Sequence, residues 1–395
     1  MVVPPLSPEG LVPHYDAFRV SERVLLTGHS HQAWPDVARA GMERAWRDAA
    51  SWVDEKWDRA FEVADRVRDS WMSLLDDADG DVALGQNTLE LVARFLSALP
   101  LSLRPRLVTT DGEFHTVRRL LSRLEEEGVE IIRVPSGDAD LVADAITEAV
   151  DNRTAAVLVS SVLFKTGRIV HGLDRVAQVC DRVGTRLLVD TYHHLNAVPF
   201  SLGHLGLDRA FVVGGGYKYC QLGEGNCFLR VPPGCTLRPV LTGWFAEFGA
   251  LADRDRPDRV GYAEGHGRFA GATYDPVSHY RAEAVADFFR EQTMTPERLR
   301  ALSQHQVGRL ASAIDALDLD PAVLTRDRHV PLEEIGGFLA LHTPRAAELS
   351  KGLRRRGVST DVRGETLRLG PAPYVTTGQL DEAVGHLEEL VRGLD

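Results

Sequence analysis

The chain has 395 residues, of which 44% are hydrophobic and 26% charged, the composition of an ordinary globular protein with room for two lobes. Its formal net charge of −12 argues against a nucleic-acid or anionic-membrane partner, because both reward basic patches. No apolar run approaches the roughly 20 residues that span a bilayer, and we expect no signal peptide because basic and apolar leader regions are missing. The cysteines lack CxxC spacing, so we expect no metal site or disulfide framework, and we expect a cytoplasmic protein.

Short β-branched runs alternate with helical stretches between residues 85 and 214. Uninterrupted apolar strands between helices predict a mostly parallel sheet that is covered on both faces. Ligands bind such sheets just beyond the carboxyl ends of the strands. In chain order, the predicted elements are a helix in 85–99, a strand at 106–110, a helix in 115–128, strands at 129–135 and 155–161, a helix in 173–184, and strands at 186–190 and 210–214.

After about residue 280 the pattern changes to long helices and short strands. Helices are predicted at 280–292, 296–317, 345–357 and 376–394, with strands at 336–343 and 366–370. We therefore predict a large domain at 46–279 and a smaller α/β domain at 280–395, with an N-terminal arm, 1–45, that folds onto the smaller domain.

Only four of the 45 basic residues are lysines, and one of them stands out. Lys218 follows a strand and three glycines in "GGGYKY", where the glycines allow another group to approach the backbone closely. A lysine that is desolvated in a cleft can lose its proton and form a Schiff base with pyridoxal phosphate. Lys56 fits a solvated helix surface and Lys351 a helix end, while Lys165 fits either a structural or a functional role.

A pyridoxal enzyme also needs a carboxylate against the pyridine nitrogen and an anion site for the phosphate. Asp190 ends the apolar strand "RLLVD", and His193 follows three residues later, where it could brace the cofactor ring. The helix in "GQNTLELVARF" offers Asn87 as N-cap, Glu90 in a capping-box position and free backbone N–H groups for an anion.

The order of these pieces resembles the class V aminotransferase group of fold-type-I pyridoxal-phosphate enzymes, and kynureninase in particular. The resemblance runs from about Gly28 to Tyr374. It implies an α/β fold with a mostly parallel seven-stranded sheet in the large domain and a smaller C-terminal α/β domain. The segment "DTYHHL" is similar to the family's Asp-x-x-His and "GYKYC" to its Tyr-Lys-Tyr-Leu, which implies cofactor roles for Asp190, His193 and Lys218.

Further cofactor contacts follow from the same resemblance. Tyr217 becomes a phosphate or proton-transfer partner, and the similarity of "GEFHT" to Asn-Phe-Pro-Thr-Asp sets Phe114 against the ring face. The phosphate loop carries over more loosely, to Asn87 and Thr88. The similarity of "SSVLFKTG" to the family's Lys-Thr-Gly turn makes Lys165 structural.

Three other residues carry expectations about the substrate and the assembly. In "TGWFAE" and "GRFAGAT", which are similar to Gly-Trp-Phe-Gly and Arg-Phe-Leu-Cys-Gly-Thr, Trp244 and Thr273 would reach the phosphate of a neighbouring subunit, which implies an obligate homodimer. In "LRLGPAP", similar to Leu-Arg-Phe-Gly-x-x-Pro, Arg368 would bind the α-carboxylate of a small amino-acid substrate, a task that suits the guanidinium fork.

The chain departs from kynureninases near the expected substrate. In "TGHSHQ", which stands in place of Gly-Asn-Ser-Leu-Gly, His29 replaces an asparagine and His31 a leucine, while Ser30 is kept; all three are assigned to the substrate side. Either the histidines are solvated loop residues, or they add titratable donors that make activity change near pH 6 to 7. A valine replaces an aspartate at Val117, and Ser161 and Leu163 replace a histidine and an asparagine.

The resemblance favours a hydrolase that cleaves the Cβ–Cγ bond of an aryl-keto amino acid to give alanine and an aromatic acid. The alternative is a class V β-lyase or aminotransferase that acts on another amino acid in specialised metabolism. A non-catalytic binding protein fits less well, because Lys218, Asp190 and Arg368 are all kept. A dinucleotide site is disfavoured, because no GxGxxG follows the strand before Lys218.

Overall fold

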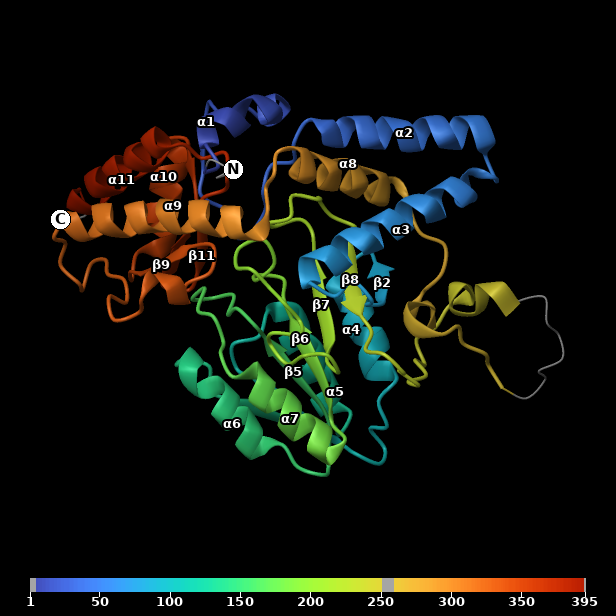
Figure 1. Cartoon of the computed structure of the whole chain (residues 1–395). Helices are drawn as coiled ribbons and strands as arrows, with labels where there is room; N and C mark the ends of the chain where they lie inside the picture. The colour runs from blue at the N-terminus through green and yellow to red at the C-terminus, as the bar shows by residue number, and fades with distance from the viewer. Residues whose placement is uncertain (1–4, 251–258, 394–395) are drawn as a thin grey trace.

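A seven-stranded sheet forms the centre of the computed structural model, which describes residues 5–250 and 259–393 (Figure 1). The strand order is β2-β8-β7-β6-β5-β3-β4, and β8 runs in the opposite direction to the other six strands of this sheet. The fold is therefore the predicted α/β fold with a mostly parallel sheet. The strands are β2 (Val82–Gly85), β3 (Arg106–Thr110), β4 (Glu130–Val134), β5 (Thr154–Ser160), β6 (Arg186–Asp190), β7 (Phe211–Gly215) and β8 (Cys227–Arg230).

Helices cover both faces of this sheet, so successive side chains of a central strand enter two different cores. On β5, Val157 and Val159 join the core beneath α3, α6 and α7, whereas Leu158 joins the core beneath α4 and α5. This is why the strand is apolar throughout instead of alternating. The helices are α3 (Lys56–Leu75), α4 (Thr88–Ser97), α5 (His115–Glu126), α6 (Val142–Ala149) and α7 (Leu173–Val183).

A third core lies at the other end of the chain and includes N-terminal residues. Tyr15 and Leu26 are buried there with Leu339 and Leu367, and β1 (Val24–Leu25) pairs in parallel with β10 (Val358–Ser359). The remaining elements there are α1 (Pro8–Leu11), η1 (Val12–Phe18), α9 (Pro296–Ala316), η5 (Leu332–Glu334), β9 (Leu339–His342), α10 (Ala346–Arg355), β11 (Asp361–Arg363), β12 (Thr366–Leu369) and α11 (Thr377–Arg392). Strands β11, β12 and β9 form an antiparallel sheet.

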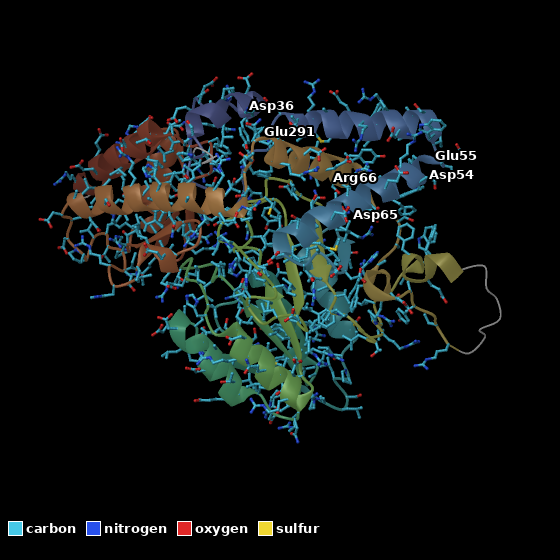
Figure 2. All side chains as sticks on the ribbon, in the orientation of Figure 1. Asp36, Asp54, Glu55, Asp65, Arg66 and Glu291 are labelled. Atoms are coloured by element: carbon cyan, nitrogen blue, oxygen red, sulfur yellow. The ribbon has the colours of Figure 1, made fainter. Side chains whose placement is uncertain are left out.

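Two helices connect these regions. Helix α2 (Val37–Trp52) packs along α8 (Val277–Glu291), and α3 also contacts α8. Arg44 of α2 and Arg66 of α3 both bind the buried carboxylate of Glu283 on α8, and Figure 2 shows Arg66 on α3. The predicted domain boundaries at 45/46 and 279/280 fall inside α2 and α8 and stay predictions. Three short 3-10 helices complete the chain: η2 (Ala139–Leu141), η3 (Trp244–Ala250) and η4 (Gly265–Phe269).

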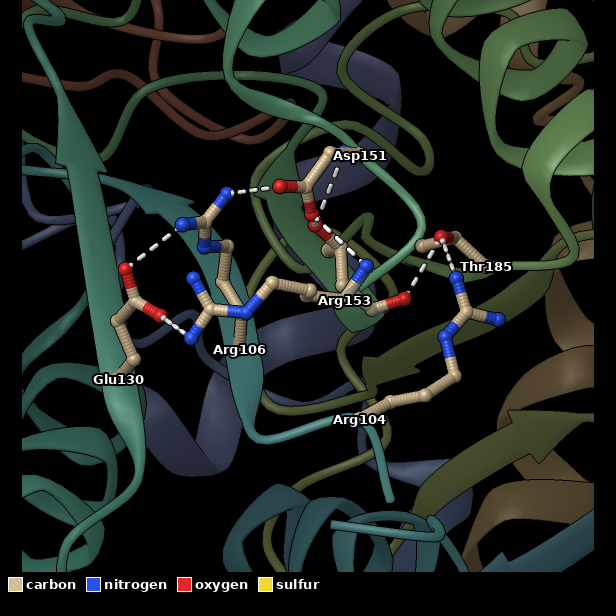
Figure 3. A network of polar contacts seen from close by, with 7 residues as sticks. Arg104, Arg106, Glu130, Asp151, Arg153 and Thr185 are labelled. Carbon is tan, nitrogen blue, oxygen red and sulfur yellow. Dashed lines mark hydrogen bonds and ion pairs between the residues drawn. The ribbon is translucent and has the colours of Figure 1, made fainter.

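An ion-pair network holds the amino ends of three neighbouring strands together (Figure 3). Arg106, the first residue of β3, donates to Glu130 of β4 at 2.8 Å and to Asp151 before β5 at 2.5 Å. Arg153 donates to the second oxygen of Glu130 at 2.8 Å. The network lies at the opposite edge of the sheet from the strand carboxyl ends, which are free to carry a site.

The start of α4 largely follows the expected capping pattern. Asn87 is the N-cap, and its side chain accepts a hydrogen bond from the Glu90 backbone N–H at 2.9 Å. The reciprocal bond of a capping box is different: Glu90 accepts from the Gln86 N–H at 3.3 Å, because its carboxylate also binds Arg94. Across 5–250 and 259–393, no helix combines the length and the apolar character that crossing a membrane requires.

Candidate active site

The carboxyl edge of the sheet carries one cavity into which most of the predicted cofactor residues project. Asp190 ends β6, Lys218 follows the neighbouring strand β7, and Phe114 follows β3, which lies beyond β5, so three parallel strands deliver their side chains to the same edge of the sheet. This is the position at which parallel sheets bind ligands. The predicted residues that line the cavity are Lys218, Asp190, His193, Tyr217, Phe114 and Thr88.

Lys218 is buried in this cavity and has an unusual environment for a lysine. Its Nζ lies 2.7 Å from His193 Nε2, and 4.5 Å from the centre of the Tyr192 ring. Burial lowers the pKa of Lys218 to about 7, although the nearby Asp190 carboxylate acts in the opposite direction. A substantial share of the amine is therefore neutral and nucleophilic near neutral pH.

The surroundings of Asp190 and His193 shift the pKa of each side chain. Burial raises the pKa of Asp190, while the Tyr192 N–H, which donates to Oδ1 at 2.8 Å, and the Lys218 cation favour the ionised form. Burial and the Lys218 charge hold the pKa of His193 well below its usual value, so its ring is neutral. His193 Nδ1 is buried without a hydrogen-bond partner among the described residues and can receive a ligand group.

The three glycines before Lys218 are required for packing. A Cβ on Gly215 would lie 2.5 Å from the Tyr192 hydroxyl, and a Cβ on Gly214 would lie 2.7 Å from the Phe228 ring. A Cβ on Gly216 would lie 2.6 Å from Leu222. Their backbone is not left-handed. The glycines therefore let β7 and the Lys218 loop pack directly against aromatic and aliphatic side chains, as the sequence predicted.

Arg368 lies beside the cavity, where its charge acts on Lys218 and His193. The side chain is 2% exposed; it donates to the Phe164 carbonyl oxygen and pairs with Asp361. Burial lowers the pKa of its guanidinium to about 10, so the group stays charged at neutral pH. Within 5–250 and 259–393 its Nε has no hydrogen-bond partner, so a donor remains for a substrate carboxylate.

The two histidines of "GHSH" occupy different environments. His29 is fully buried, with its ring 4.5 Å from the Phe338 ring and Nε2 3.5 Å from Asp361. Burial, with the Arg368 and Lys218 charges, holds its pKa well below the usual value. The interpretation of His29 as a solvated loop residue was wrong, and so was its expected titration near pH 6 to 7, because a buried ring among cations stays neutral.

His31 and Ser30 lie next to Tyr217. The His31 ring is exposed and stacks on the Tyr217 ring at 4.6 Å, and Ser30 Oγ lies 3.3 Å from His31 Nδ1. Tyr217 lines the cavity, so His31 is one side chain removed from it.

Three of the predicted cofactor-binding residues do not line this cavity within the described part of the chain. Asn87 is exposed and uses its side chain as a helix cap. Trp244 is 45% exposed and packs against Phe245 and Phe248, and Thr273 is exposed. Their predicted contacts with a phosphate stay predictions. Lys165 is exposed in its loop, consistent with the structural role expected for it.

Sequence reasoning missed three residues at the site. Glu113 is buried directly behind Phe114, Tyr192 stands over Lys218, and Asp361 holds Arg368. A signal existed for Glu113, a carboxylate between an apolar strand and an amphipathic helix, and for Tyr192, which lies inside the Asp-x-x-His segment. No local pattern marks Asp361.

The side chains around Lys218 suit pyridoxal phosphate by their chemistry. They include a lysine with a lowered pKa, a buried carboxylate, aromatic faces from Phe114 and Tyr192, and the unpartnered Nδ1 of His193. With Lys218 in its present position, the cavity volume is about 20 Å³, room for one water molecule. A cofactor ring therefore requires side chains that line the cavity to move.

Comparisons with known proteins bear on this site. Kynureninase of Pseudomonas fluorescens is 26% identical, over 97% of this chain and 93% of its own length. An uncharacterized aminotransferase, YcbU of Bacillus subtilis strain 168, is 22% identical over 89% of this chain and 90% of its own. A C-DES mutant solved with glycine covalently linked to its PLP cofactor superposes with a TM-score of 0.81 at 14% identity, covering 95% of this chain and 98% of that one. No family model matches the chain.

The comparisons support a class V pyridoxal-phosphate enzyme. The fold-type-I architecture and the cofactor expected from the sequence are both confirmed. The comparisons do not distinguish between the two reactions, because the kynureninase and aminotransferase relatives are similarly distant.

Proposed function

We propose that the chain is a kynureninase-like hydrolase, which adds water across the Cβ–Cγ bond of an aryl-keto amino acid to give alanine and an aromatic acid. The observation that carries the proposal is the convergence of Lys218, Asp190 and His193 in one buried cavity, with Arg368 beside it. The 26% identity with a kynureninase, over nearly the full length of both chains, supports this choice of reaction.

Each of these side chains has a distinct task. Pyridoxal phosphate, when bound, supplies an electron sink for the bonds to the substrate's α-carbon. Asp190 supplies the negative charge that holds a proton on the cofactor's pyridine nitrogen. Lys218 would hold the cofactor, and its Nζ would take and return the substrate's α-proton, which its lowered pKa permits near pH 7.

Substrate binding uses Arg368. Its guanidinium is oriented by Asp361 and by the Phe164 carbonyl oxygen, and the Nε–H faces no protein acceptor. An amino-acid carboxylate satisfies that donor, and a fixed guanidinium binds it with little loss of side-chain entropy.

A second candidate, a class V β-lyase or aminotransferase, is favoured by the side chains at the positions that differ from kynureninase. Val117 lines the cavity with an apolar surface. Ser161 is buried and uses its hydroxyl on His194 and on the Asp190 carbonyl oxygen, and Leu163 is packed in the core. The relative described as an aminotransferase supports this alternative.

We propose that the active enzyme is a homodimer in which a neighbouring subunit supplies Trp244 and Thr273. Neither residue lines the Lys218 cavity of its own chain. Trp244 belongs to a partly exposed aromatic cluster with Phe61, Phe245 and Phe248, a surface that a second subunit would cover.

Incubation of the purified holoenzyme with kynurenine, 3-hydroxykynurenine and cysteine derivatives, followed by mass spectrometry of the products, tests the reaction. Release of alanine with an aromatic acid supports the hydrolase. Pyruvate from a cysteine derivative, or transfer of the amino group to a keto acid, would favour the alternative. The His29→Asn/His31→Leu double variant should raise kynurenine cleavage if these histidines face the substrate.

A further inference from the structure

A buried carboxylate lies directly behind the cofactor cavity and has no part in the mechanism given so far. Glu113 is 3% exposed. Its Oε1 accepts from Thr110 Oγ1 at 2.8 Å and from the Ser160 N–H at 3.1 Å, and its Oε2 accepts from Ser160 Oγ at 2.5 Å. These bonds join the end of β3 to the end of β5.

Two residues link Glu113 to the cavity. The residue after it, Phe114, lines the cavity, and so does Ser160. Ser160 is in register with Asp190 on the neighbouring strand β6, so Glu113, Ser160 and Asp190 form a row along the carboxyl edge of the sheet. A change at Glu113 is therefore passed directly to residues that line the cavity.

We propose that Glu113 is a positioning residue for the cofactor: it fixes Phe114 and the end of β5, and its negative charge reinforces that of Asp190 on the bound cofactor. The inference rests on the cofactor, not on the choice of substrate.

The electrostatic surroundings of Glu113 make this charge variable near neutral pH. Burial raises its pKa to about 7, against the hydrogen bonds from Ser160 and Thr110, and the Asp190 carboxylate raises it further. Thr110 and Ser160 do not titrate, and the Lys218 cation acts on Asp190. Among these groups, Asp190 is the charge that faces Glu113. Above pH 7 Glu113 adds a second negative charge, which favours protonation of the cofactor nitrogens.

Glu113→Gln tests the proposal, because a glutamine can accept from Thr110 and the Ser160 N–H while donating to Ser160 Oγ. The visible absorbance of the holoenzyme is followed from pH 5 to 10, to obtain the apparent pKa of the bound cofactor. We expect the variant to fold and to bind pyridoxal phosphate, with that apparent pKa lowered by about one unit, the effect of one nearby charge. Asp111→Asn removes a charge from the exposed side of the same turn and should leave it unchanged.

Thr110→Val is the second variant, and it leaves Glu113 in place. Loss of one hydrogen bond to the ionised carboxylate keeps Glu113 neutral to higher pH, so the cofactor's apparent pKa should move in the same direction by a smaller amount. Wild-type apparent pKa values in both variants would overturn the proposal and leave Glu113 a structural residue. In the infrared spectrum of the wild type, the carbonyl stretch of a protonated carboxyl should fade between about pH 6 and 8, and a stretch that persists to pH 10 would show an uncharged Glu113 and would also overturn the proposal.

Discussion

At the scale of single residues, the chemistry of this protein depends on the burial of groups that are normally charged. Lys218, Asp190, His193 and Arg368 each have a shifted pKa for the same first reason, the loss of water around them. Perturbed groups that gather at a strand edge mark a functional site, and here they coincide with the residues that the sequence motifs predicted.

The first prediction concerns the pH dependence of cofactor attachment. Because the neutral amine is the nucleophile and burial lowers the pKa of Lys218 to about 7, the rate at which the apoenzyme captures pyridoxal phosphate should rise about tenfold per pH unit below pH 7 and level off above it. Stopped-flow absorbance measures this rate. A rate that keeps rising to pH 10 would indicate an ordinary lysine. Lys218→Ala should show no borohydride-trapped cofactor, and label on Lys165 would contradict the assignment.

The second prediction concerns Asp190. Asp190→Asn keeps an acceptor for the Tyr192 N–H, which now binds Oδ1 at 2.8 Å, but removes the charge that holds the pyridine nitrogen protonated. Turnover should fall about 10³-fold, roughly 4 kcal/mol of transition-state stabilisation, while the cofactor remains bound. Steady-state kinetics and the visible spectrum measure the two effects separately. Near-normal turnover would show that the carboxylate serves the turn rather than the cofactor.

At the scale of elements, the site depends on how closely β7 packs against the segment after β6. The Tyr192 hydroxyl lies 2.5 Å from the position that a Cβ on Gly215 would take, and the Cys227 sulfur lies 2.6 Å from it. The backbone of β7 therefore packs so closely against these two side chains that only a glycine fits at position 215. The glycines before Lys218 are required for this packing, and the packing in turn positions the residues of the cofactor site.

The third prediction follows from this packing. Gly215→Ala should displace the Tyr192 ring toward Lys218, with a loss of about 1 to 3 kcal/mol in the free energy of unfolding and weaker cofactor binding. Thermal unfolding and a pyridoxal-phosphate titration measure the two quantities. Gly137→Ala is the matched control, because nothing lies within 4 Å of a Cβ at that position. Equal behaviour of the two variants would refute the packing argument.

At the scale of the whole molecule, the cavity is built by one chain, but two of the predicted cofactor contacts lie on the surface. Trp244 and Thr273 are exposed, and the aromatic cluster around Trp244 is partly open to solvent. A second subunit would bury this cluster and bring the two residues to a neighbouring phosphate.

The fourth prediction tests the proposed dimer by complementation. Trp244→Ala and Lys218→Ala should each be nearly inactive, but a refolded mixture of the two should recover activity. In a mixed dimer, one site carries both substitutions and the other carries neither. Activity assays with sedimentation measurements of the mixture provide the test. A monomeric protein, or a mixture without recovery, would contradict the shared site.

Local sequence patterns determined the strands, the helices and the edge at which the site lies. Apolar runs such as 155–161 predict strands buried on both faces, and Asp190 and Lys218 follow such runs, so the rule for parallel sheets brings them together. The N-cap at Asn87 was equally predictable, because capping depends on residues within one turn.

Tertiary structure alone decided which polar groups are buried and what faces them. His29 lies in a polar loop, "TGHSHQ", yet it is fully buried, because β12 and Phe338 cover it from a distant part of the chain. Arg368 meets Asp361 across the antiparallel pair β11 and β12, and Glu113 meets Ser160 across two strands. Desolvation and partner choice set the protonation of these groups, and both depend on contacts between segments that local periodicity does not encode.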